Sequence, residues 1–267
     1  MGNAMPNGSD RSTLLVTTSW DDGHPSDLRL ADLLEKHEAS GTFYIPNLNV
    51  EGRPVLRRSE IRGLGRHLEI GGHTRDHVSL TQLAPHEAAQ QVIFNKHWLE
   101  DLWGQEVICF AYVRGHHNRA VRRLVRNAGF RYGRTVTNLS DGTGPDCYQI
   151  PTTMQFFPHS NDIYIRNYLS GGSGLRRLAL LRAVLGKRGL LDRLYRAAEL
   201  CRRRGGCFHI WGHSWELNEY NLWDELDRLL AHLRQMHAQF VTNRVLWSHR
   251  LAFDAAAAGA AVPEPVS

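Results

Sequence analysis

Short apolar runs alternate with helix-like segments along most of this chain, and that alternation restricts its possible folds more than any other feature. The runs predicted as strands are Leu14–Thr18, Thr42–Ile45, Leu68–Gly71, Val107–Tyr112, Phe130–Thr135, Cys207–Trp211 and Phe240–Thr242. The helices predicted between them include Leu28–Lys36 after Ser26, one that begins at Pro85, Arg119–Ala128 after Asn118, and Trp223–Met236. Strands joined by helical crossovers pair in parallel, so we expect an α/β fold, a distorted barrel of about seven parallel strands.

The domain organisation expected from 267 residues is one catalytic domain over residues 13–254. Residues 1–12 are polar and are expected to be flexible, and the Ala-rich tail at 255–267 is expected to be disordered. The alternation breaks between about 155 and 206, which predicts an insertion or an elaborated crossover packed on the same domain. No apolar run approaches the roughly 20 residues of a membrane-spanning helix.

Positive charge is concentrated in one segment. Residues 176–204 contain ten Lys or Arg and two acidic residues, a net +8, whereas the rest of the chain has a net charge of −3. Leucines interleave with these arginines, so the segment is either an amphipathic surface for an anionic membrane or a solvated helical face with buried leucines. A nucleic-acid-binding motif is lacking, which argues against nucleic acid as a partner.

The compartment expected is the cytoplasm, with peripheral contact at the inner membrane face if residues 176–204 bind lipid. The N-terminus has no apolar signal core, and the four cysteines show no C-x-x-C spacing. A disulfide framework or a cysteine-type zinc site is therefore not indicated.

Polar clusters follow four of the predicted strands. They are Asp21-Asp22-Gly23-His24, His73-Thr74-Arg75-Asp76-His77, Arg114-Gly115-His116-His117 and His213-Ser214-Trp215-Glu216. The carboxyl ends of parallel barrel strands converge on one face, where active sites lie, so we expect these clusters to meet there.

A metal site is predicted from three of these residues. His73 and His77 are four apart and would project from the same side of a helical turn, although such a pair alone is more often made of surface or capping histidines. Asp22 could complete a set of two histidines and one carboxylate with open positions, which is typical of catalytic rather than structural sites. Asp21 could stay uncoordinated beside the metal as a general base, or the two aspartates could form an Asx turn.

These motifs resemble the polysaccharide deacetylases with the NodB homology domain, carbohydrate esterase family 4. Ser19-Trp20-Asp21-Asp22-Gly23 is similar to the family motif T-F-D-D-G, and His73-Thr74-Arg75-Asp76-His77 matches H-[ST]-x-x-H. Phe208–His213 corresponds to the late strand that ends in the catalytic histidine. The resemblance covers about residues 14–242 and implies a distorted (β/α) barrel.

The resemblance also implies roles for individual residues. Asp22, His73 and His77 would be the ligands of a divalent metal, most often Zn²⁺. Asp21 would be the catalytic base and His213 the catalytic acid. Arg134, or else Arg114, would orient the base; the acidic partner of His213 is unplaced, with Asp141 and Asp146 as weak candidates.

One motif departs from the family. Phe110-Ala111-Tyr112-Val113-Arg114-Gly115 resembles F-A-Y-P-x-G, but Val113 replaces the proline. Backbone N–H groups near Val113 and Gly115 could still hold an oxyanion, because they survive side-chain substitution. Trp20 and Trp215 could stack on a sugar ring, although tryptophan is usually a core residue.

The function expected is hydrolysis of an N-acetyl group on an amino sugar. The substrate would be an N-acetylated sugar, lipid- or nucleotide-linked, in cytoplasmic biosynthesis of a cell-surface glycan such as lipopolysaccharide. The alternatives are hydrolysis of another amide, such as a formamide, on the same scaffold, and a sugar-binding relative that has lost catalysis.

Overall fold

The computed structural model describes residues 13–65, 67–172, 174–186 and 188–248. The predictions for residues 1–12 and 255–267 lie outside this part of the chain. None of the helices in the described ranges is both long enough and apolar enough to cross a bilayer.

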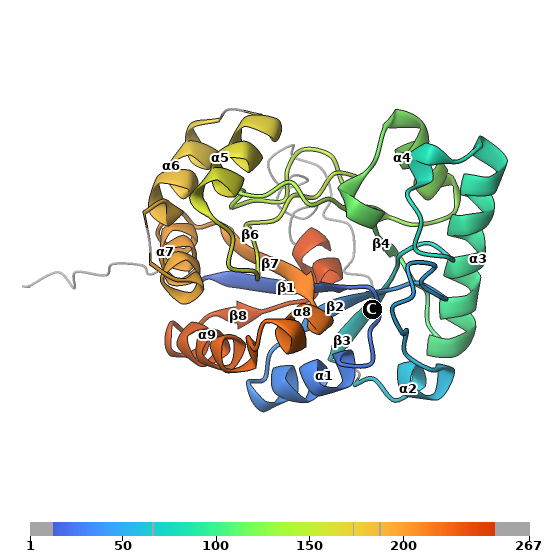
Figure 1. Cartoon of the computed structure of the whole chain (residues 1–267), viewed down its shortest axis with the longest axis horizontal. Helices are drawn as coiled ribbons and strands as arrows, with labels where there is room; N and C mark the ends of the chain where they lie inside the picture. Colours follow the sequence, from blue (N-terminus) through green and yellow to red (C-terminus); the bar gives the residue numbers. More distant parts are fainter. Residues whose placement is uncertain (1–12, 66, 173, 187, 249–267) are drawn as a thin grey trace, which may run out of the picture.

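A single parallel sheet forms the centre of the molecule (Figure 1). Its strands are β1 (Leu15–Asp21), β2 (Gly41–Ile45), β3 (Leu68–Gly72), β4 (Cys109–Ala111), β5 (Tyr132–Arg134), β6 (Met154–Gln155), β7 (Cys207–His213) and β8 (Gln239–Phe240). They are ordered β5-β4-β3-β2-β1-β7-β6, and β8 pairs with β1 beside this path. The prediction of a distorted barrel of about seven parallel strands is confirmed.

The sheet curls so that its two edges approach each other. The segment between β5 and β6 bridges them, because Thr152 N donates to Thr137 O at 2.9 Å and Leu139 N donates to Thr153 O at 2.9 Å. Thr153 N in turn donates to His209 O of β7 at 2.7 Å. Strand β6 has only two residues, too few to show an alternating pattern, and it was therefore not predicted from the sequence.

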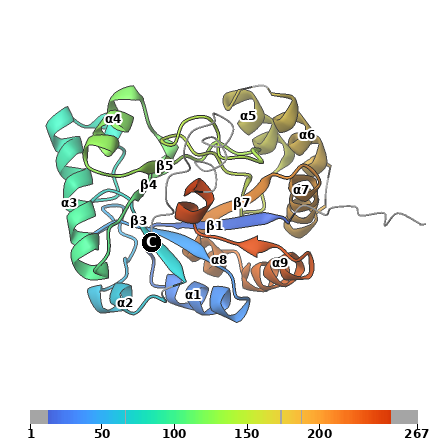
Figure 2. The same cartoon turned by 180° about the vertical axis from the view of Figure 1, so that it is seen from behind.

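Helices surround the sheet (Figure 2). They are α1 (Asp27–Lys36), α2 (Arg58–Arg62), α3 (Pro85–Trp103), α4 (Arg119–Asn127), α5 (Asn161–Ser170), α6 (Leu175–Val184), α7 (Leu190–Arg203), α8 (Ser214–Glu219) and α9 (Trp223–Gln235), with short 3₁₀ turns η1 (Leu80–Gln82) and η2 (Val113–Gly115). With helices on its outside and side chains filling its interior, the sheet is buried on both faces, which explains why its strands are nearly continuous apolar runs.

Two predicted helix starts have different outcomes. Asn118 caps α4 as expected, since its Oδ1 accepts from Val121 N at 2.9 Å. Ser26 does not cap α1: it has helical backbone angles and its side chain makes no capping hydrogen bond.

The segment 155–206 contains α5, α6 and α7, which connect β6 to its parallel neighbour β7. It is therefore an elaborated crossover. Leu180, Leu190 and Leu194 are buried under these helices. Several of its arginines pair within the protein: Arg176 lies 3.0 Å from Asp141, and Arg202 lies 2.9 Å from Glu199.

Candidate metal centre and active site

The carboxyl ends of β1, β3 and β7 bring the predicted site residues together. Asp21, the last residue of β1, is in register with His213, the last residue of β7. His73 directly follows β3, and Asp22 directly follows β1. The expectation that clusters after separate strands would converge is thus met in the geometry of the barrel.

Asp22, His73 and His77 form a compact group of three buried side chains. Their donor atoms all lie within 4.8 Å of one another. Asp22 Oδ1 lies 2.9 Å from His77 Nε2 and 3.6 Å from His73 Nε2. One carboxylate and two imidazoles are a donor set that suits zinc or a similar divalent ion.

Two observations show that this group fits a metal. Asp22 Oδ1 is buried and makes no hydrogen bond, despite its close approach to His77. The Nδ1 of His73 lies 2.9 Å from the carbonyl oxygen of Ala111 and is placed to donate to it, which leaves Nε2 with its lone pair directed at Asp22. Buried polar atoms without a partner are rare, and a cation would satisfy this one.

The backbone of residues 73–78 explains how both histidines reach one point. The segment forms bends rather than the predicted helical turn, and Thr74 and His77 have positive φ angles of 66° and 55°. Thr74 Oγ1 accepts from Val78 N at 3.1 Å, and Asn95 Oδ1 accepts from His73 N at 2.9 Å. The prediction of a helical turn was wrong because side-chain acceptors stabilise a tighter loop.

Burial alone would raise the pKa of Asp22. The interactions of its carboxyl with His73 and His77, and the charge of His213, outweigh this effect of burial. The pKa of this carboxyl lies well below its usual value. Asp22 is therefore an anion at neutral pH, the form that can bind a cation.

Asp21 contacts Arg134 and not the histidines. Arg134, the last residue of β5, donates from Nη2 to Asp21 Oδ1, and both side chains are buried. The predicted alternative, Arg114, lies instead at the pocket rim, where its exposed side chain pairs with Glu51 at 2.6 Å. The structure thus brings Arg134, the first candidate, to the carboxylate of Asp21.

His213 has an acidic partner that sequence analysis missed. Glu216 Oε2 lies 3.0 Å from His213 Nδ1. Burial opposes the charged imidazole, but Glu216 and then Asp22 outweigh burial and raise the pKa of His213 to about 9. Asp141 and Asp146 were wrong as candidates, since Asp141 pairs with Arg176 and Arg204, and Asp146 caps a turn at Tyr148. The spacing of three residues at the start of a helix could have indicated Glu216.

The two tryptophans are placed differently. Trp215 lines the pocket, and its Nε1 donates to Asp22 Oδ2 at 2.9 Å. One face of its ring is covered by the Arg53 guanidinium at 3.4 Å, and its ring stacks on that of His213 at 5.0 Å. Trp20 is fully buried and tilts against Phe156, so the structure places it in the core and not at the pocket.

The loop with the substituted motif adopts a short 3₁₀ turn. Val113 is buried, and Gly115 has a φ of 71°. Gly115 N donates to Tyr112 O at 2.7 Å, so this N–H holds the turn. Neither Val113 nor Gly115 lines the pocket, whereas Arg114 between them does.

A pocket of about 280 Å³ opens at this site. Its lining comprises Asp21, Asp22, Glu51, Arg53, His73, His77, Arg114, Val136, Trp211, His213 and Trp215. Two larger hollows lie elsewhere, but neither is lined by Asp22, His73 or His77. The candidate metal ligands therefore lie in the same cavity as Asp21 and His213.

Comparisons with known proteins show a likeness to polysaccharide deacetylases over part of the chain. The family model described as polysaccharide deacetylase matches residues 9–133. The peptidoglycan-N-acetylglucosamine deacetylase of Bacillus cereus is 24% identical over 119 residues, which cover 44% of this chain and 54% of that protein. The chain spans about half the length of the curated relatives it matches.

Solved structures show the same fold. The peptidoglycan deacetylase PdaC of Bacillus subtilis, in a mutant form, aligns with a TM-score of 0.59 and 16% identity over 94% of this chain and 98% of that one. A pseudoenzyme of carbohydrate esterase family 4 from Bacillus anthracis aligns with a TM-score of 0.55 and 15% identity over 88% of this chain and 66% of that one. The resemblance of this chain to the polysaccharide deacetylase family is confirmed.

Proposed function

We propose that this protein is a divalent-metal-dependent hydrolase that removes an N-acetyl group from an amino sugar. The observation that carries the proposal is the meeting of Asp22, His73 and His77 in one pocket with Asp21 and His213. The named activity of the Bacillus cereus relative, deacetylation of N-acetylglucosamine in peptidoglycan, supports an N-acetylated sugar as substrate. Zinc is the metal that we propose, because two imidazoles and a carboxylate suit it.

Different residues of this chain have different roles in the proposed reaction. Asp22, His73 and His77 would hold the metal, which when bound supplies a Lewis acid for the amide carbonyl and lowers the pKa of water. Asp21, oriented by Arg134, accepts the proton of the attacking water. A backbone N–H at Val113 or Arg114 donates to the developing oxyanion.

His213 completes the reaction as the general acid. The nearby Glu216 favours its protonated form, so it can deliver a proton to the leaving nitrogen. Expulsion of an unprotonated amine would be far slower. Trp215 orients Asp22 through its indole N–H, a role that its covered ring favours over stacking on a sugar.

The biological setting is proposed on sequence grounds. We place the reaction in cytoplasmic biosynthesis of a cell-surface glycan such as lipopolysaccharide, on a lipid- or nucleotide-linked sugar. Membrane contact through residues 176–204 stays a prediction, and the internal pairing of Arg176 and Arg202 counts against it.

The test is release of acetate from N-acetylated nucleotide sugars, lipopolysaccharide fragments and chitin oligomers, before and after complete chelation. We expect activity on at least one substrate, loss of that activity on chelation, and recovery with Zn²⁺. Activity that persists without metal would contradict the mechanism. Release of formate but not acetate from matched substrates would favour the other amide hydrolase, and sugar binding without turnover would favour the inactive relative.

A further inference from the structure

Four arginines form a stripe on α4, outside the catalytic pocket. They occupy positions 119, 122, 123 and 126, a spacing that places them along one side of the helix. Together with Asp146 they line a hollow of about 260 Å³. The stripe was not singled out from the sequence, where the basic segment at 176–204 was more conspicuous.

The hollow has more positive charge than its single carboxylate can balance. Asp146 accepts hydrogen bonds from Tyr148 N at 2.8 Å and Gln149 Nε2 at 2.7 Å, and it lies 3.7 Å from Arg122. Arg119 and Arg123 are exposed. Like charges at this spacing on a helix are destabilising, so a bound anion would stabilise the stripe. The planar guanidinium group matches phosphate oxygens in particular.

In the basic segment at 176–204, by contrast, several arginines have partners within the protein. Arg176 pairs with Asp141, and Arg202 pairs with Glu199. Arg177 donates to the carbonyl oxygens of Tyr168, Asn167 and Asn138. These arginines stabilise the α5–α7 crossover, so its high net charge does not by itself indicate an anion site.

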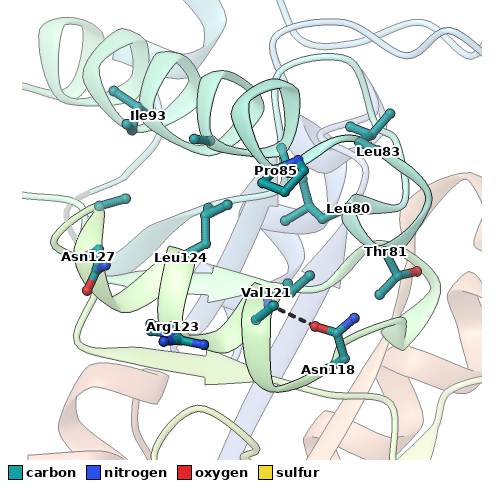
Figure 3. Close-up of a pocket in the computed structure, with 14 residues that line it drawn as sticks. Leu80, Thr81, Leu83, Pro85, Ile93, Asn118, Val121, Arg123, Leu124 and Asn127 are labelled. Atoms are coloured by element: carbon teal, nitrogen blue, oxygen red, sulfur yellow. Dashed lines mark hydrogen bonds between the residues drawn. The ribbon is translucent and has the colours of Figure 1, made fainter.

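An apolar groove of about 400 Å³ lies against the same helix, between α3 and α4 (Figure 3). Leu80 and Pro85 lie on one side of it and Val121 and Leu124 on the other. Arg123 lines both the groove and the arginine hollow. An apolar cavity therefore adjoins the cluster of arginines.

We propose that the groove and the arginine hollow together bind one amphiphile, an apolar chain that ends in a phosphate group. The chain would lie between α3 and α4, and the phosphate would lie against Arg123 and Arg126. The volume of the groove is within the range of small-molecule sites. The proposal does not depend on the deacetylase activity, since none of these residues belongs to the catalytic pocket.

Titration calorimetry of the full chain with decyl phosphate, below its micelle concentration, tests the proposal. We expect one saturable site, with affinity at least tenfold higher than for inorganic phosphate or for decyl maltoside. The double variant Arg123→Gln, Arg126→Gln should bind decyl phosphate at least tenfold more weakly. Ala89→Phe, which places a ring in the groove, should have a similar effect.

The matched control is Arg182→Gln with Arg188→Gln, two exposed arginines in the α6–α7 region, on the other side of the sheet from α3 and α4 (Figure 1). This control should bind within twofold of the unchanged protein. Equal losses in both arginine pairs, or phosphate binding as tight as decyl phosphate binding, would overturn the proposal. Binding to anionic vesicles without binding to decyl phosphate would also overturn it. If Ala89→Phe fails to fold by circular dichroism, the arginine variants decide alone.

Discussion

Asp21 and Asp22 are adjacent in the chain, yet the structure gives them different partners. Asp22 faces two histidines, whereas Asp21 contacts Arg134. We expect Asp21→Asn to retain one metal ion per chain and to lose at least about 100-fold in kcat, because an amide cannot accept the proton. Elemental analysis and acetate release measure the two effects. Loss of the metal in this variant would show that Asp21 is a ligand instead.

Glu216 provides a second test at the level of single residues. It is the foremost of the groups that raise the pKa of His213, which must be protonated to act as an acid. In Glu216→Gln the pKa of His213 should fall, so activity should be lost at a lower pH on the alkaline side. The profile of kcat/KM against pH measures this shift, which we expect to be about one pH unit or more.

If Glu216 only supported the fold, its substitution would lower activity equally at every pH. Glu219→Gln is the matched control, because Glu219 ends the same helix and pairs with Arg53 rather than with His213. Its alkaline limb should match that of the unchanged protein. An unshifted limb in Glu216→Gln would contradict the assigned role.

At the scale of elements, local sequence patterns predicted most strands and the strand ends that carry the candidate site residues. β3 was predicted as Leu68–Gly71 and extends one residue further, to Gly72. What local patterns could not supply are contacts made by distant residues. The loop at His73, for example, is held by Asn95 from α3, which lies 22 residues further along the chain. Such partners carry no periodic signal in the sequence.

The turn η2 offers a prediction about an element. Gly115 has a φ of 71°, and a Cβ added there would lie 2.3 Å from Val136 Cγ2. Gly104 has a φ of 72° with nothing within 4 Å of an added Cβ, so it isolates the backbone strain. Gly104→Ala should lower the free energy of unfolding by about 1–2 kcal/mol, and Gly115→Ala should lower it further.

Urea denaturation of both variants measures the difference. Adding Val136→Ala to Gly115→Ala should recover part of the loss, because it removes the contacting methyl groups. Equal stabilities for the two glycine variants would mean that Val136 can move aside without cost.

At the scale of the whole molecule, the barrel interior below the site is held by polar contacts as well as apolar packing. His209 of β7 lies with its Nε2 2.6 Å from Ser19 Oγ of β1, and Asn243 donates to the same hydroxyl at 2.9 Å. The strands β1 and β7 and the segment after β8 are thereby joined in one buried network. Burial, and then the charge of Arg134, lower the pKa of His209 to about 3.

This network makes the fold sensitive to acid. In the unfolded chain His209 titrates near pH 6.5, so between about pH 6.5 and pH 3 the unfolded state binds one more proton than the folded state. The contribution of His209 is complete above pH 6.5 and is lost as the pH falls. A fall from pH 7 to pH 5 should therefore reduce the free energy of unfolding by about 2 kcal/mol through His209.

Urea denaturation of the unchanged protein and of His209→Gln at both pH values isolates this contribution. The variant should be less stable at pH 7 but should lose less stability on acidification. Parallel losses in the two proteins would show that His209 is protonated in the folded state, or that other histidines control the acid response.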